Sequence, residues 1–177
     1  MFWIGWQVWW LWVFAFGQTP DLAANHPVYF LPTPAGMCSF QVLPDKRMPR
    51  ERSWIVRRMA GETTIMCRLP TRPVFKLRTC DIDGDGRLDL IAGVVKTISN
   101  IPYRRIYVYS MEGNRLLPLW LGTRLSYHLL DFDLRHIGRK TLLLANERRG
   151  KKSFRGLYQW REWGFRSLQM KEEVSSL

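Results

Sequence analysis

The chain has 177 residues and a formal charge of +12, with 27 Lys and Arg against 15 Asp and Glu. This length suits one domain with a sizeable core. The arginine runs could meet nucleic acid, anionic lipid headgroups or acidic glycans, but no run is dense enough to define a patch, so solvated strand edges and loops are the preferred interpretation. The three cysteines, Cys38, Cys67 and Cys80, lack CxxC spacing and have no neighbouring histidine, which argues against a zinc site. The sequence leaves open whether Cys38 and Cys67 form a disulfide or all three cysteines are buried thiols.

Residues 1–17 are uncharged and apolar, and they contain five of the nine tryptophans. As a helix, an apolar run of about 15 residues spans only ~22 Å, which is short of the ~30 Å hydrocarbon core. The segment therefore predicts a secretory signal peptide that is cut ahead of Gln18. An uncleaved apolar anchor is the alternative, because no basic residue precedes the run and tryptophan is typical of the membrane interface. Both interpretations predict a protein that is secreted or lies in the periplasm or cell envelope.

Residues 18–50 contain six prolines, which exclude long helices and central strands. We expect an extended lead-in here, with at most one edge strand near 28–31. From residue 51 onward, short aromatic and aliphatic runs are separated by turn signals, and no window has helical periodicity. The clearest runs are 74–80, 88–95, 105–110 and 116–121. The sequence therefore predicts an all-β fold.

The predicted strands belong to an internal repeat. When the sequence is aligned with itself at an offset of 52 residues, or 51 in the second half of the unit, turn residues match turn residues and strand residues match strand residues. The matched pairs include Asp81 with Asp133, Gly86 with Gly138, Tyr107 with Tyr158, Gly113 with Gly164 and, going backwards, Val108 with Val56. We therefore divide the β-repeat domain, 51–177, into a partial repeat (51–73), a complete repeat (74–125), a degenerate repeat (126–170) and a tail (171–177).

The complete repeat contains the acidic stretch D-I-D-G-D-G-R-L-D at 81–89. Carboxylates this close repel one another unless a cation offsets their charge. A hard divalent ion with oxygen ligands, of which calcium is the usual one, fits this pattern. We expect Asp81, Asp83, Asp85 and Asp89 to supply carboxylate oxygens and Arg87 to supply its main-chain carbonyl. The intervening glycines let the backbone wrap tightly around the ion.

Two helical calcium motifs share the opening of this loop and do not fit the rest of it. An EF-hand needs a glutamate at position 12 between two helices, whereas position 12 is Ala92 and the flanks are strand-like. A dockerin needs a second similar loop, and none follows.

With the following run L-D-L-I-A-G, the loop resembles the FG-GAP/VCBS repeat, the calcium-loop unit of integrin α-chain propellers and of many secreted bacterial proteins. The resemblance is strongest over 74–121 and weaker over 126–170 and 54–66. It implies four-stranded antiparallel blades with calcium tying the loop between two strands. About three repeats are fewer than the 4–8 blades of closed propellers, so we expect an incomplete or open propeller, or a ring completed by a partner chain. In the degenerate repeat Asp133 and Gly138 remain but the other acids are gone, so that copy should bind no ion.

We predict a calcium-stabilised extracytoplasmic module that binds or acts as a scaffold for an envelope protein or an anionic glycan. We do not expect an enzyme. The alternative is a polysaccharide-active enzyme or accessory subunit, with Asp131 and Asp133, or Glu147, as candidate carboxylates. No feature of the sequence marks these acids as catalytic.

A second alternative is a basic protein that binds nucleic acid or anionic lipid. The apolar leader argues against nucleic acid, and we expect Trp120, Trp160 and Trp163 to fill a β core and not to stack on bases.

Overall fold

The computed structural model describes residues 28–33, 36–44, 47, 53–59, 62–69, 74–122 and 124–173. Within these ranges every regular element is a β-strand, which confirms the all-β prediction. In the same ranges there is no helix of the length and apolarity that a membrane crossing needs. The predicted leader, 1–17, lies outside the described residues. The predicted tail begins inside the last strand, which ends at Glu173.

The strands form three four-stranded antiparallel sheets, in each of which strands that follow one another along the chain are neighbours. The first sheet contains β1 (Val28–Thr33), β2 (Gly36–Pro44), β3 (Ser53–Met59) and β4 (Glu62–Leu69). The middle sheet contains β5 (Val74–Cys80), β6 (Asp89–Ile98), β7 (Ile101–Glu112) and β8 (Arg115–Trp120). The last sheet contains β9 (His128–Ile137), β10 (Lys140–Arg149), β11 (Lys152–Arg161) and β12 (Gly164–Glu173).

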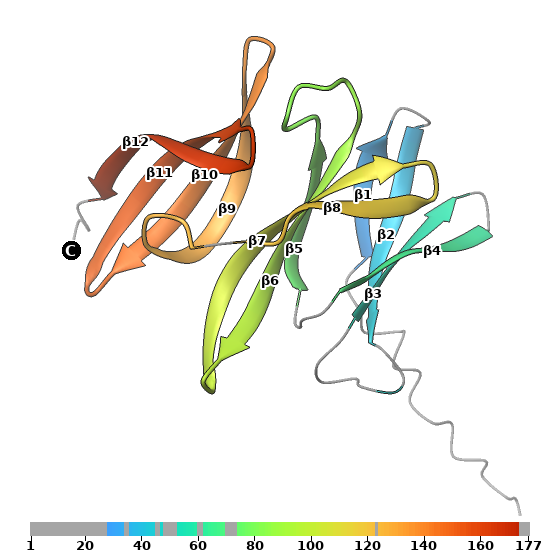
Figure 1. Cartoon of the computed structure of the whole chain (residues 1–177), viewed down its shortest axis with the longest axis horizontal. Helices are drawn as coiled ribbons and strands as arrows, with labels where there is room; N and C mark the ends of the chain where they lie inside the picture. The colour runs from blue at the N-terminus through green and yellow to red at the C-terminus, as the bar shows by residue number, and fades with distance from the viewer. Residues whose placement is uncertain are drawn as a thin grey trace, which may run out of the picture.

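The sheets lie side by side in chain order, with the middle sheet between the other two (Figure 1). One apolar core fills the space between the first and middle sheets, and a second lies between the middle and last sheets. Strand β6 contributes to both, because Leu90 faces the first core while Ile91 faces the second, and neither is exposed. A strand that is covered on both faces reads as a continuous apolar run, as 90–95 does.

The extended lead-in predicted over 18–50 is wrong for residues 36–44, although the edge strand expected near 28–31 is present as β1. Because β2 pairs between β1 and β3, the first sheet is a full four-stranded unit over 28–69 and not a partial repeat over 51–73. The prolines are tolerated because of where they lie. Pro32 is in the edge strand β1 and Pro44 is the last residue of β2, positions at which a missing N–H costs little.

The repeat phase corresponds to strand positions, although the loop of the last repeat does not. Tyr107 and Tyr158 are both buried in the third strand of their sheets. Asp133 was expected to open a loop, but it lies inside β9 opposite Leu144, and β9 and β10 are joined by a tight turn at 138–139. The long loop of the middle sheet therefore has no counterpart in the last one. No sheet closes on itself, and the described sheets form an open row (Figure 1).

The three cysteines are free thiols. Cys38 and Cys67 belong to the first core, and burial raises the pKa of Cys67 to about 12. Cys80 is buried in the second core together with Phe132, its partner in the repeat. These thiols therefore act as small apolar side chains.

Candidate metal centre

The acidic loop joins β5 to β6 and winds around the side chain of Asp81. The N–H of Gly84 donates to Oδ1 of Asp81 (2.7 Å), and the N–H of Gly86 donates to Oδ2 (3.0 Å). Both glycines have positive φ angles, +85° and +83°, which residues other than glycine rarely adopt. This winding brings one carboxylate oxygen each from Asp81, Asp83 and Asp89 within 4.8 Å of one another.

Asp89 is the buried member of this cluster. It is the first residue of β6 and is fully inaccessible to solvent. Its Oδ2 accepts a hydrogen bond from the N–H of Ile82 (2.9 Å), whereas its Oδ1 has no hydrogen-bond partner among the described residues. Desolvation raises the pKa of Asp89 to about 7, and the charges of Asp83, Asp85 and Asp81 add to the shift. A cation among these oxygens would offset both effects.

Asp85, the fourth predicted carboxylate, is directed to Arg87. Its Oδ2 accepts from Nε of Arg87 (2.7 Å), and its Oδ1 accepts from the N–H of Arg87 (2.8 Å). These hydrogen bonds lower the pKa of Asp85. Arg87 also reaches Glu112 at the end of β7 (3.0 Å), so its guanidinium ties the loop to the neighbouring hairpin. From the sequence we expected only the main-chain carbonyl of Arg87 to take part, so this side-chain role is a finding of the structure.

The residues present fit a calcium ion. Calcium takes six to eight hard oxygen ligands and tolerates irregular geometry, whereas magnesium requires a nearly ideal octahedron. Three convergent carboxylates, one of them buried with an unpartnered oxygen, supply the hard anionic donors. The main-chain carbonyl of Arg87 and water would complete the coordination, whereas Asp85 would have to leave Arg87 to join it.

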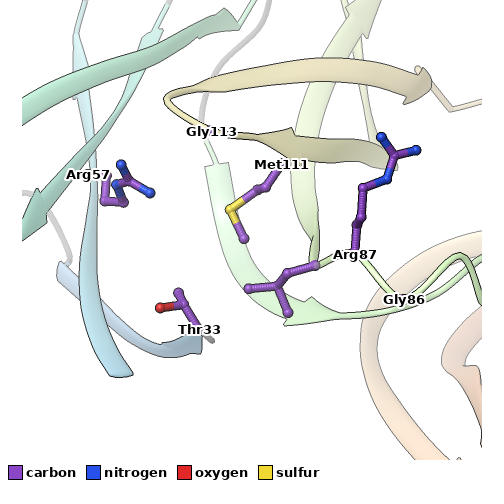
Figure 2. A pocket seen from close by; sticks show the side chains of 7 residues that line it. Thr33, Arg57, Gly86, Arg87, Met111 and Gly113 are labelled. Atoms are coloured by element: carbon purple, nitrogen blue, oxygen red, sulfur yellow. The ribbon is translucent and has the colours of Figure 1, made fainter. Parts of the chain in front are cut away.

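Two clefts flank the loop. The first, of about 320 Å³, lies between the first and middle sheets (Figure 2) and is lined by Thr33, Arg57, Gly86, Arg87, Leu88, Met111 and Gly113. Its two guanidinium groups are already occupied, because Arg57 donates to Asn114 and Arg87 pairs with Asp85 and Glu112. The second, of about 560 Å³, lies toward the last sheet and is lined by Asp83, Gly84, Asp85, Lys140, Gln159, Trp160, Arg161 and Glu162.

The carboxylates considered for catalysis have structural partners. Nζ of Lys76 contacts both oxygens of Asp131 (3.0 and 2.9 Å), and Nε of Arg78 contacts Asp133 (2.9 Å). The hydrogen bond from Arg78 lowers the pKa of Asp133. These pairs connect β5 to β9, the first strands of the middle and last sheets.

Glu147 is fully buried in β10. Its carboxylate accepts hydrogen bonds from the N–H of Tyr127 and from the hydroxyl of Tyr158, which itself accepts from the N–H of Ser126 (3.2 Å). Desolvation and the bond to Glu147 raise the pKa of Tyr158. Glu147 and Tyr158 thus bind the backbone of the segment that connects the middle and last sheets.

Three tryptophans, Trp120, Trp160 and Trp163, were expected in a core, and for one of them this is wrong. Trp120 and Trp160 are partly buried against the second core, but Trp163 is 86% exposed. Trp163 lies in the two-residue turn between β11 and β12, where its side chain has no sheet to cover it.

No family model matches the chain, and comparison with curated proteins and with solved structures finds no significant match either.

Proposed function

We propose that the protein is a calcium-stabilised β-repeat module, related in design to FG-GAP/VCBS blades, that binds or organises other molecules outside the cytoplasm. The observation that carries this proposal is the convergence of Asp81 and Asp83 on the buried, partly unpartnered carboxylate of Asp89. With its carboxylates engaged in this way, the loop is suited to a structural ion and not to acid–base catalysis.

The stacking of the sheets supports the propeller-like part of the proposal. Each sheet is a four-stranded meander with its first strand near that of the next sheet, as the ion pairs between β5 and β9 illustrate. The outer face of the first sheet exposes Phe30, Met37 and Ile65, each by more than 60%. This is the surface on which a partner chain would complete the row of sheets.

An extracytoplasmic location agrees with a loop of this type. Extracellular calcium modules have dissociation constants of roughly 10⁻⁴–10⁻³ M, so they fill only where calcium is abundant. The partners that we propose are another envelope protein or an anionic glycan.

Thermal unfolding in calcium and in chelator tests the metal-dependent part of the proposal. At a concentration of calcium about 100 times its Kd, binding to the folded state adds about 2.7 kcal/mol. For a chain of this size we expect Tm to rise by about 5–10 °C. Asp83→Asn should lose most of that rise, while Glu162→Gln, which removes an exposed charge near the same cleft, should keep it. An equal rise in the two variants would contradict the proposal.

A further inference from the structure

A third cleft, of about 320 Å³, lies between β8 of the middle sheet and the turn that joins β11 to β12. It is lined by Trp120, Arg124, Leu125, Arg161, Trp163, Gly164, Phe165 and Arg166. We propose that this cleft, which we call the Trp–Arg cleft, binds a carboxylated or sulfated saccharide unit. The inference rests on the proposed role as a binding module and names its ligand class, but it does not require the calcium ion.

The positive charge of the Trp–Arg cleft is not neutralised by the residues that line it. Arg124, Arg161 and Arg166 are exposed, and no acidic side chain lines the cleft. None of the three forms an ion pair with another described residue. A guanidinium presents a planar fork of donors that matches a carboxylate or sulfate group. Three unpaired guanidiniums around one hollow therefore favour an anion.

The aromatic residues beside the cleft pack against one another. Trp120 and Trp160 both meet Phe165 edge to face, with ring centroids 5.2 and 5.3 Å apart and interplanar angles of 77° and 87°. The β11–β12 turn lies against these residues, because a Cβ added to Gly164 would lie 3.1 Å from Nε1 of Trp120. The neighbouring Trp163 lines the same cleft as the arginines, with 86% of its surface exposed. An exposed indole in a short turn is a surface available to a ligand.

A sugar ring matches this combination better than a nucleic acid does. The apolar C–H face of a pyranose suits the electron-rich face of an indole, while an acidic substituent at the ring edge suits the arginines. A single-stranded nucleic acid needs a series of aromatic faces on which successive bases stack. Of the three aromatic residues that line the cleft, Trp120 and Phe165 are partly buried and pack edge to face, and Trp163 is 86% exposed. The volume also lies at the small end of the range for ligand pockets.

Calorimetric titration of the full chain with trigalacturonate tests the proposal. The neutral control is the fully methyl-esterified trimer, which keeps the sugar rings and removes the charge. We expect trigalacturonate to bind at least tenfold more tightly than its ester. A sulfated carrageenan oligosaccharide distinguishes the two acidic groups. If it binds more tightly than trigalacturonate, the cleft is assigned to sulfated glycans; if it binds more weakly, the cleft is assigned to uronates.

Substitutions place the binding in the Trp–Arg cleft. Trp163→Ala and the double variant Arg161→Ala/Arg166→Ala should each weaken binding about tenfold, with unchanged Tm because all three residues are exposed. The control variant is Arg148→Ala. It removes an exposed arginine that lies near the C-terminal end of β10 and does not line the cleft, and it should change the affinity less than twofold. Equal effects of the cleft and control variants would overturn the proposal.

Three further outcomes would also overturn the proposal: no binding of either acidic saccharide, equal binding of the ester, or tighter and Trp163-dependent binding of oligo-dT. Repeating the titration in EGTA separates the two proposals. Saccharide binding without a calcium-dependent Tm would contradict only the metal proposal, and a calcium-dependent Tm without saccharide binding would contradict only this one.

Discussion

Asp89 determines how the acidic loop responds to pH. Its pKa in the folded protein is about 7, against about 3.9 for an ordinary aspartate, so without a cation the folded state holds the proton more tightly than the unfolded state. The stability that this contributes is fully present below about pH 4 and is lost as pH rises through 7. In chelator we therefore expect Tm to decrease between pH 5 and pH 8, as scanning calorimetry would record.

The variant Asp89→Asn isolates this effect, because an amide can still accept the hydrogen bond from Ile82 but does not titrate. The difference in Tm between wild type and variant should shift in favour of the variant as pH rises. A difference that stays constant from pH 5 to pH 8 would show that Asp89 does not titrate in this range.

Tyr158 is a second residue with a defined energetic role. In Tyr158→Phe, the buried carboxylate of Glu147 loses one donor and the N–H of Ser126 loses its acceptor. We expect the free energy of unfolding to fall by about 1–3 kcal/mol in urea titrations. Tyr103→Phe is the matched control, since the ring of Tyr103 stacks on His128 and its hydroxyl has no hydrogen-bond partner among the described residues. A loss in the control as large as in Tyr158→Phe would contradict this role.

At the scale of elements, β6 requires a glycine where two aromatic rings approach it. A Cβ at position 93 would lie 2.6 Å from Phe75 and 2.7 Å from Phe132, two rings that pack edge to face at 6.2 Å. Gly93→Ala should therefore reduce stability by about 1–3 kcal/mol through overpacking. Adding Phe75→Leu should recover part of that loss, and a double-mutant cycle measures the coupling. Strictly additive effects would mean that Phe75 does not restrict this position.

The strands that the sequence predicted are those with a strong apolar signature. β6 is apolar on both faces and β7 carries a run of aromatic and aliphatic residues, so both were visible from composition alone. β2 was missed, and β1 was expected only as an edge strand, because proline was taken to exclude central strands. Edge positions and strand ends tolerate proline, and which strand is at an edge is a property of the whole sheet. Sequence periodicity does not contain that information.

The candidate site was predictable as a local pattern but not in its side-chain pairing. The spacing of the acids placed Asp81, Asp83 and Asp89 in one loop, and the structure brings them together. The second partner of Arg87, Glu112, lies far away in sequence and is brought to the loop by the β7–β8 hairpin, so the tie between loop and hairpin could not be predicted from the spacing. The Trp–Arg cleft was not predicted, because it combines residues of two sheets whose relative placement follows from the stacking.

At the scale of the whole molecule, the outer face of the first sheet should drive association. Strand pairing places Phe30, Met37 and Ile65 on the face turned away from the first core, where they are 69%, 65% and 62% exposed. We expect concentration-dependent self-association in light scattering, which Phe30→Ser/Ile65→Lys should reduce. Leu168→Lys, on β12 of the last sheet, should have little effect. A wild type that stays monomeric at all concentrations would contradict this expectation.

The proposed function depends on a divalent ion that neutralises the carboxylate oxygens between β5 and β6. A crystal equilibrated with millimolar Ca²⁺ and measured for anomalous scattering tests this most directly. We predict an anomalous peak with oxygens of Asp81, Asp83 and Asp89 at about 2.3–2.6 Å. An ordered loop without such a peak, or with Arg87 in its place among the three carboxylates, would contradict the account.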